Sequence, residues 1–392
     1  MRRIAQKGRH RYENDSRYNL QNVTDGFAHR SASSTSEDAL LNRICTAYNE
    51  AITRHKSAPP IYDASKWWAE VRTRGLAPVT DALSTSDING LQKMYRNFFR
   101  DPCSTGLVSV PYGMSRAYFD GQIKDVHRHF YLGDFLHRVD YWTKESGGQY
   151  TLRDLAAPSI GNPFGVTIAG TFIRDGAAYQ HYCAHKIAKL LGVQMSVVVE
   201  IGGGFDGMAY YLLRDHPGVS YLGLDVPESL ALASYYLMTA FPQLRFLLYG
   251  EGEVTEETIA QFDVILLPLC ELPAIPDNCV DLSFSSHALS DITHEASGDY
   301  LDNVARTTRR FFYCIGVAHS EQETTPPTCG RYGSFKLVEV RTLEWNSHKS
   351  AASVEVECVY QVKKDTEPLG PGTAKPPSSE RSDELAKESF DL

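Results

Sequence analysis

The chain has 392 residues, a formal net charge of -9, 42% hydrophobic residues and 22% charged residues. This ordinary globular composition excludes wholesale disorder, and the acidic balance disfavours a dedicated nucleic-acid binder. No uncharged apolar run reaches the roughly 18 residues that a membrane span requires. The eight cysteines are scattered and form no C-x-x-C pair, so we expect buried thiols, no zinc site of that spacing and a cytoplasmic protein.

Taken in chain order, composition divides the chain into four regions. Residues 1–36 are polar and end in a serine-rich run, which predicts a disordered leader. Residues 37–150 carry apolar side chains at three- and four-residue steps, which predicts a mainly helical region. That region is either a small packed domain or a lid that binds the acceptor. Residues 151–363 are expected to form an α/β domain, and the proline-interrupted, acidic residues 364–392 predict a disordered tail.

After residue 190, short runs of β-branched residues alternate with segments of helical spacing. Strands are expected at 197–201, 220–224, 244–249, 264–267, 280–285, 311–317, 335–343 and 354–362, and helices at 206–215, 227–241, 255–261 and 298–309. Such alternation predicts right-handed βαβ units in a doubly wound sheet. The last two strands are long and adjacent, and they predict an antiparallel hairpin at one edge of that sheet.

The most informative segment joins an apolar strand to a glycine turn and then to a helix. The strand is Val197–Ile201 and the turn is Gly202, Gly203 and Gly204. Glycine lets the backbone turn tightly and lets a ligand approach, and a helix N-terminus presents unpaired N–H groups. The next strand ends at Asp225, about 20 residues later, where a carboxylate can bind ribose hydroxyls. The segment predicts a site for an adenosine-type cofactor, with a tight turn beside a solvated aspartate as the structural alternative.

Two acidic residues argue against a dinucleotide cofactor. The G-x-G-x-x-G pattern is missing, because Asp206 stands where a pyrophosphate needs neutral or positive surroundings. Glu200 ends the strand two residues before Gly202. A carboxylate there repels a pyrophosphate but suits the ammonium group of S-adenosylmethionine. An NAD-type oxidoreductase is therefore disfavoured.

Several segments together resemble the sugar O-methyltransferase family of class I S-adenosylmethionine-dependent methyltransferases. They are Glu200–Gly207, Asp225–Ala233, Leu267–Phe284, Val280–Asp291, and upstream Gly161–Gly165 and Tyr179–Ile187. The likeness covers roughly residues 60–362. It departs from the family at Asp206, where glycine is usual, and in the strand at 244–249, which is an addition between the second and third core strands.

The resemblance implies a Rossmann-like class I methyltransferase fold that binds S-adenosylmethionine and releases S-adenosylhomocysteine. It assigns Glu200, Gly202, Gly203 and Gly204 to the methionyl end and Asp225 to the ribose. It also implies that Leu269 and Cys270 flank the adenine, and that Ser286 touches the cofactor.

A loop rich in acid–base groups follows the fourth core strand. It contains His287, Asp291, His294 and Glu295, at the sheet edge where a ligand of such a fold binds. A sugar hydroxyl is weakly acidic, and histidine, with an ordinary pKa of roughly 6.5, suits the role of general base. We expect His287 to be the base, with Asp291 orienting it or replacing it. Capping of the next helix is the structural alternative.

The acceptor is expected to contact residues on either side of the cofactor. Candidates are His294 and, on the helix before the first core strand, His181 and Tyr182. The i, i+4 spacing of His181 and His185 places both on one face of that helix. The alternative is an amphipathic helix with a surface histidine. No metal site is assigned. A magnesium ion bound by Asp291, His294 and Glu295 stays an alternative, since no spacing there is diagnostic.

The sequence therefore predicts an S-adenosylmethionine-dependent O-methyltransferase that modifies a sugar, such as the sugar of a glycosylated natural product. We expect a small glycoside as partner and neither nucleic acid nor membrane, with homo-oligomers left open. Two alternatives remain: a binding or assembly protein that keeps the fold without catalysis, and a methyltransferase for a non-sugar small molecule.

Overall fold

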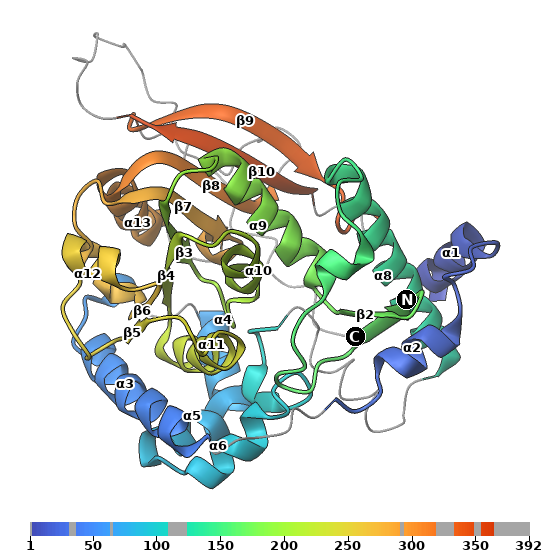
Figure 1. Cartoon of the computed structure of the whole chain (residues 1–392), viewed down its shortest axis with the longest axis horizontal. Coiled ribbons are helices and arrows are strands. Elements are labelled where there is room, and N and C mark those ends of the chain that lie inside the picture. The colour runs from blue at the N-terminus through green and yellow to red at the C-terminus, as the bar shows by residue number, and fades with distance from the viewer. Residues whose placement is uncertain are drawn as a thin grey trace, which may run out of the picture.

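A computed structural model describes residues 2–30, 37–62, 66–108, 124–290, 294–318, 333–348 and 354–363. The first part of the chain is helical (Figure 1). Its helices are α1 (Arg2–Tyr12), α2 (Leu20–Gly26), α3 (Asp38–Lys56), α4 (Lys66–Val71), α5 (Ala77–Thr85), α6 (Ile88–Tyr95) and α8 (Asp125–Glu145). A π-helical turn, η2 (Arg72–Leu76), joins α4 to α5, and the short 3-10 turns η1, η3 and η4 cover Pro60–Tyr62, Pro102–Ser104 and Leu152–Leu155.

The second part is built on an eight-stranded sheet in the order β5-β6-β4-β3-β7-β8-β10-β9. Its strands are β3 (Ser196–Ile201), β4 (Val219–Asp225), β5 (Phe246–Leu248), β6 (Val264–Pro268), β7 (Val280–Ser286), β8 (Thr308–Ala318), β9 (Phe335–Leu343) and β10 (Val354–Val362). The strands from β5 to β8 are parallel, whereas β10 runs antiparallel to both β8 and β9. A separate hairpin consists of β1 (Gly165–Ile168) and β2 (Thr171–Arg174).

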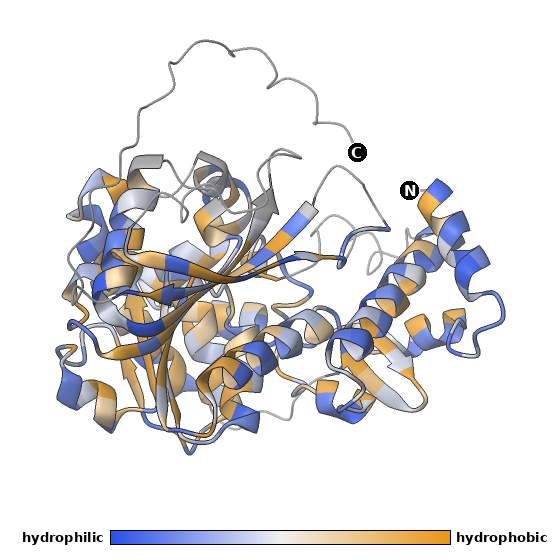
Figure 2. Ribbon diagram, turned by 90° about the horizontal axis from the view of Figure 1, so that it is seen from above, coloured by the Kyte–Doolittle hydropathy of each residue, from blue (hydrophilic) through white to orange (hydrophobic). Residues whose placement is uncertain are grey.

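Helices cover both faces of this sheet, as Figure 1 shows. The crossovers are α9 (Ala177–Leu191), α10 (Gly207–Asp215), α11 (Pro227–Ala240), α12 (Glu256–Gln261) and α13 (His294–Thr307), with the turns η5 (Leu269–Ala274) and η6 (Ala288–Ser290). Successive strand residues belong to two different apolar clusters: Val198 lies in the one that contains residues of α9, α10 and α11, and Val199 in the one with residues of α12 and α13. Figure 2 shows apolar residues concentrated on the central strands. A sheet buried on both faces explains why its strands read as nearly continuous apolar runs.

The predicted doubly wound sheet with a C-terminal antiparallel hairpin is confirmed. Each predicted strand overlaps an observed strand. The additional strand, β5, does not separate β4 from β6: it pairs in parallel with β6 and forms the outer edge of the sheet.

The N-terminal region differs from its prediction. Residues 2–30 were expected to be disordered, yet α1 and α2 pack on α8 and bury Tyr12 and Val23. Tyr12 donates a hydrogen bond to Asp140, 3.0 Å away. The polar composition of this segment concealed a few well-spaced apolar anchors, and tertiary packing gives the helices stability that their length alone does not. The helical region also shares one apolar cluster with the sheet, so the expected boundary near residue 150 does not separate two cores.

Cysteines within the described ranges are buried free thiols, as the sequence predicted. None of the helices the structure describes is long and apolar enough to cross a membrane. Cellular location stays a prediction.

Candidate functional site

The glycine turn lies at the carboxyl edge of the central strand β3. Gly202 and Gly204 have φ angles of 79° and 66°, which favour glycine because a Cβ is unfavourable there. Neighbours from distant segments press against both residues. A Cβ on Gly202 would collide with the Ala288 side chain, and one on Gly204 would lie 2.9 Å from the carbonyl oxygen of Leu107. The turn therefore brings the loop after β7 and the helical region together.

Asp225 joins this turn to the end of β4. One carboxylate oxygen accepts a hydrogen bond from the backbone N–H of Gly204 at 2.8 Å, and the other accepts from the N–H of Val226 at 2.7 Å. Burial raises the pKa of Asp225 to about 7, although these two hydrogen bonds oppose the shift. Each oxygen keeps a lone pair, so the carboxylate can accept further hydrogen bonds from hydroxyl groups.

Two more carboxyl groups lie around the turn. Glu200 is 4% exposed and accepts a hydrogen bond from the Tyr221 hydroxyl at 2.6 Å. Burial raises its pKa to about 7. A Cβ on Gly203 would lie 3.1 Å from the Glu200 Cδ. The Glu200 side chain is thus held against the turn and forms part of its wall.

Asp206, which departs from the family pattern in the sequence, also has an unusual conformation and environment in the structure. It precedes α10 with φ 59°, a left-handed conformation that aspartate tolerates better than most residues. The side chain is 2% exposed, and within the described residues its Oδ2 atom has no hydrogen-bond partner. Burial, then the charges of Glu200 and Asp225, raise its pKa well above the ordinary value. It belongs to the interior beneath the turn.

The loop after β7 brings His287 to the same edge of the sheet. Its φ angle is 64°, and its backbone N–H donates to the carbonyl oxygen of Ile315 at 2.8 Å. The imidazole Nε2 lies 3.5 Å from Glu355 Oε1, and the side chain is 39% exposed. Glu355 is largely buried and also accepts a hydrogen bond from the Asn346 side chain at 3.1 Å. The site thus contains an accessible histidine backed by a buried carboxylate.

Ser286 ends β7 immediately before this histidine. Its hydroxyl and that of Tyr179, from the first turn of α9, are 2.6 Å apart. Ser285 donates to the carbonyl oxygen of Ile201 at 3.1 Å, which fixes β7 beside the strand that carries the glycine turn. Ser286 therefore lies between the glycine turn and the histidine, and its contact with the cofactor stays a prediction.

His181, predicted to bind the acceptor, is instead part of the packing between helices. It is 3% exposed, and its Nδ1 accepts a hydrogen bond from the Trp142 indole at 3.1 Å. Its Nε2 lies 3.8 Å from Asp215 at the end of α10. Burial lowers its pKa to about 4. The i, i+4 spacing correctly indicated one helix face, but aromatic residues cover that face.

Tyr182 is likewise inside the molecule. Its hydroxyl donates to Glu357 on β10 at 2.7 Å, and the Tyr313 hydroxyl donates to the same oxygen at 2.9 Å. Lys186 and Arg341 lie 3.7 and 3.4 Å from the other oxygen of Glu357. These contacts make Tyr182 a link between α9 and the sheet, and not a group that faces an acceptor.

The remaining predicted residues divide into two groups. Leu269 and Cys270 begin η5 directly after β6, and Cys270 is 3% exposed. Asp291 lies outside the described residues, and nothing is described of the side chains of His294 and Glu295. No group of three or more metal-binding side chains occurs within the described part of the chain.

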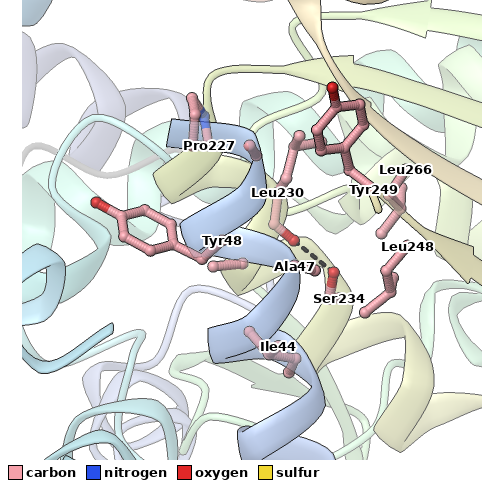
Figure 3. Close-up of a pocket in the computed structure, with 11 residues that line it drawn as sticks. Ile44, Ala47, Tyr48, Pro227, Leu230, Ser234, Leu248, Tyr249 and Leu266 are labelled. Atoms are coloured by element: carbon pink, nitrogen blue, oxygen red, sulfur yellow. Dashed lines mark hydrogen bonds between the residues drawn. The ribbon is translucent and has the colours of Figure 1, made fainter. Parts of the chain in front are cut away.

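A small apolar cavity lies between α3 and α11, away from His287. Figure 3 shows Ile44, Tyr48, Leu230 and Leu266 around it, with Ser234 bonded to the carbonyl oxygen of Leu230 at 2.7 Å. Its volume of about 10 Å³ is enough for about one water molecule. It is too small to hold a cofactor and reflects local packing.

Sequence reasoning missed Glu355 and Tyr221 as parts of the site. Glu355 begins the last strand, about 70 residues after His287, and only the antiparallel pairing of β10 with β8 brings it there. Tyr221 occupies an ordinary inward-facing strand position. The unusual acidic residue Asp206 was the one signal that could have pointed to a buried polar partner beneath the turn.

The strand order and the glycine turn define a Rossmann-like α/β fold. No protein-family model and no curated protein matches the chain. Among solved structures, the pyocyanin biosynthetic protein PhzM is 18% identical, over 65% of this chain and 77% of that one, with a TM-score of 0.36.

Two further solved structures show the same weak likeness. A SAM-dependent methyltransferase from Aquifex aeolicus is 13% identical over 48% of this chain and 94% of its own, with a TM-score of 0.31. An arsenic(III) S-adenosylmethionine methyltransferase from Chlamydomonas reinhardtii is 14% identical over 45% and 66%, also with a TM-score of 0.31. Likenesses this low carry no argument about activity, which has to be argued from the site.

Proposed function

We propose that the chain is an S-adenosylmethionine-dependent O-methyltransferase that acts on a hydroxyl of a sugar. One observation carries the proposal: Asp225, the glycine turn and His287 lie at one edge of the sheet. Ala288, adjacent to His287, packs on Gly202, and Gly204 donates its N–H to Asp225. A cofactor site and a candidate base are therefore neighbours in space.

The polar groups at the turn fit a nucleoside sulfonium cofactor. Asp225 can accept hydrogen bonds from the ribose hydroxyls, because its protein partners are two backbone N–H groups. Gly202, Gly203 and Gly204 allow close approach of the methionyl end, with Glu200 behind them. Leu269 and Cys270, which begin η5 directly after β6, would flank the adenine. When bound, the cofactor supplies an activated methyl group on sulfur.

His287 is the group that removes the proton from the acceptor hydroxyl. Glu355 faces Nε2 and stabilises the imidazolium that forms, while the second ring nitrogen is left to take the proton. General-base assistance of this kind contributes about 10²–10⁴-fold to the rate. The positive φ of His287 supports the role, since uncommon backbone conformations concentrate at functional sites.

The sugar is the finer part of the proposal. Hydroxyl and amide groups of Tyr179, Ser286 and Asn346 lie near the candidate base, and such groups suit an acceptor with several hydroxyls. The family resemblance of the sequence points the same way. A non-sugar small molecule with a polar hydroxylated surface is the competing acceptor.

Titration calorimetry with S-adenosylmethionine tests the cofactor assignment. We expect Asp225→Ala to weaken binding by about 10- to 100-fold or more, since it removes an acceptor of charge-assisted hydrogen bonds. Unchanged affinity in a folded Asp225→Ala variant would refute the ribose assignment. Transfer of a radiolabelled methyl group to a panel of glycosides and matched aglycones then tests the acceptor class.

The packing against the turn favours a second candidate function, a binding protein that keeps the fold without catalysis. The Leu107 carbonyl and the Ala288 side chain press on the turn, and Asp206 stands where the resembling family usually has glycine. This candidate predicts cofactor binding without methyl transfer to any member of the panel.

A further inference from the structure

A series of contacts links the Asp225 carboxylate to the helical N-terminal region. Trp68 on α4 donates its indole N–H to Glu228 at 2.8 Å. On its other side, a Cβ on Gly106 would lie 2.8 Å from the Trp68 ring, and the next residue, Leu107, touches Gly204. Gly204 in turn donates its N–H to Asp225. Two segments from outside the sheet domain therefore lie over the end of β4.

Glu228 completes this series from the first turn of α11. Its side chain is 1% exposed, and its Oε1 accepts hydrogen bonds from Trp68 and from Nε of Arg72, the latter at 2.7 Å. Glu228 follows Asp225 by three residues, at the start of α11 directly after β4, and its charge contributes to the raised pKa of Asp225. The two carboxyl groups therefore lie close enough to interact electrostatically.

The pairing of Glu228 with Arg72 leaves half of each group unused. Within the described residues, Glu228 Oε2 and Arg72 Nη2 are both buried and lack a hydrogen-bond partner. A two-point contact between guanidinium and carboxylate would have used both atoms. Leaving a buried charged group partly unpaired costs free energy, so the arrangement is suited to a ligand that supplies the missing partners.

A hydroxyl group is the ligand chemistry that matches this pair. It donates one hydrogen bond and accepts others, so it can satisfy Glu228 Oε2 and Arg72 Nη2 at once. A vicinal diol can place one hydroxyl on this pair and the other on Asp225. We propose that Arg72 and Glu228 form a second hydroxyl-binding subsite beside Asp225, for the diol of a nucleoside ligand. This inference rests on the proposed function and extends it.

The subsite makes the helical region part of cofactor binding. Arg72 begins the π-helical turn η2, a type of distortion that occurs frequently at functional sites. Trp68 lies one turn before it and holds the same carboxylate. The segment from α4 to η3 therefore covers the bound nucleoside and contacts it, besides packing against the rest of the protein.

Calorimetry with two ligands tests the inference: S-adenosylhomocysteine and its counterpart without the 2′ and 3′ hydroxyls. We expect Arg72→Met to weaken binding of S-adenosylhomocysteine by about 10- to 100-fold, the range for a hydrogen bond to a charged group. Binding of the dideoxy counterpart should change by less than about 3-fold, because the lost contact needs a hydroxyl. Equal losses for both ligands, or no loss for either, would overturn the inference.

Arg74→Ala is the matched control. Arg74 lies in the same π-helical turn, 79% exposed, with its side chain near Glu70 at 3.9 Å. The substitution removes a guanidinium from the same segment without changing a contact of Glu228. Both ligands should therefore bind with the same affinity as they bind the unmodified protein. A loss equal to that of Arg72→Met would attribute the effect to the charge of the segment and overturn the inference.

A double variant separates ligand contact from folding. Among the described residues, Arg72→Met leaves Trp68 as the remaining hydrogen-bond partner of Glu228, so a loss of local folding has to be tested separately. Arg72→Met/Glu228→Gln removes both charges, and thermal unfolding without ligand checks its stability. We expect the double variant to discriminate poorly between the two ligands. Full recovery of S-adenosylhomocysteine affinity in the double variant would show a structural ion pair and contradict the inference.

The same titrations distinguish this inference from the proposed function. Failure of the unmodified protein to bind S-adenosylhomocysteine would refute both. Binding that depends on Asp225 but not on Arg72 would refute the second subsite alone and leave the proposed cofactor site intact.

Discussion

At the scale of single residues, the site depends on how its carboxyl groups are placed. Asp225 keeps free lone pairs toward a ligand, whereas Glu200 and Asp206 are enclosed beneath the glycine turn. Glu355 is again different, because it is buried behind an exposed imidazole. Four carboxyl groups near one sheet edge therefore have different tasks, set by exposure and by partners and not by residue type.

The role of His287 is tested by His287→Ala. We expect turnover to fall by about 10²–10⁴-fold while affinity for S-adenosylmethionine stays within about 3-fold, because the imidazole acts on the acceptor proton. Single-turnover rates and calorimetry measure the two effects.

Glu355→Gln provides the companion measurement. It keeps the shape of the side chain but removes the charge that favours the imidazolium, so we expect turnover to fall while affinity for S-adenosylmethionine stays within about 3-fold. A full rate in either variant would reject the assignment of base and partner.

At the scale of elements, the glycine turn is where strand, helix and loop meet. β3 delivers the turn, α10 follows it, and the loop after β7 presses on it through Ala288. Because the carboxyl ends of parallel strands share one edge, residues far apart in sequence converge there. The link between α9 and β10 through Tyr182 and Glu357 holds the hairpin that carries Glu355.

Gly202→Ala tests the close approach at the turn. A methyl group there would collide with Ala288, and φ is 79°. We expect a loss of about 1–3 kcal/mol in the free energy of unfolding, with weaker cofactor binding. Denaturant unfolding measures the first effect and calorimetry the second.

Gly170→Ala is the control for backbone strain alone. Gly170 has φ 77° in the turn between β1 and β2, and no neighbouring atom lies within 4 Å of an added Cβ. Its variant should lose less stability and bind cofactor normally. Equal effects in the two variants would mean that strain, and not the contact with Ala288, explains the first result.

Tyr182→Phe tests the structural role assigned to that residue. It removes one of two phenol donors from Glu357, which is buried. We expect a loss of about 1.5–3 kcal/mol in the free energy of unfolding, typical of a hydrogen bond to a charged group. The KM for the acceptor should stay the same; an increase of tenfold or more would restore Tyr182 as an acceptor-binding residue.

At the scale of the whole molecule, the buried carboxyl groups make stability depend on pH. Burial raises the pKa of Glu200 from 4.5 to about 7 and that of Asp206 well above 3.8. The folded state therefore binds more protons than the unfolded state above about pH 4. Their stabilising contribution is complete below the unfolded-state values and is lost as pH rises through the folded-state values.

The ligand-free protein should accordingly become less stable between about pH 5 and pH 8. Asp206→Asn keeps a residue that tolerates the left-handed conformation and removes the titration. At alkaline pH we expect it to raise the free energy of unfolding, with a smaller gain at pH 5. Denaturant titrations at both pH values measure this; a gain that does not depend on pH would contradict the protonation account.

The sequence alone determined the sheet domain in considerable detail. Runs such as Val197–Ile201 and Val280–Ser285 are apolar because both faces of their strands are buried, and that pattern is local. The glycine turn and the acid about 20 residues later are likewise local features with a physical reason. The prediction of a disordered leader failed because a few anchors such as Val23 carry little weight in composition, although Val23 is fully buried where α2 packs against α8 and β1.

Only the tertiary structure decided which polar side chains share a space. Spacing indicated that His181 and His185 lie on one helix face, but not that Trp142 and Tyr211 cover it. The fold brings Glu355 close to His287, and Arg72 close to Glu228 beside Asp225, although these partners lie far apart in the sequence. Strand identity follows from burial along a few consecutive residues, which sequence records. The surroundings of a charged group depend on residues far along the chain, and only the folded arrangement fixes them.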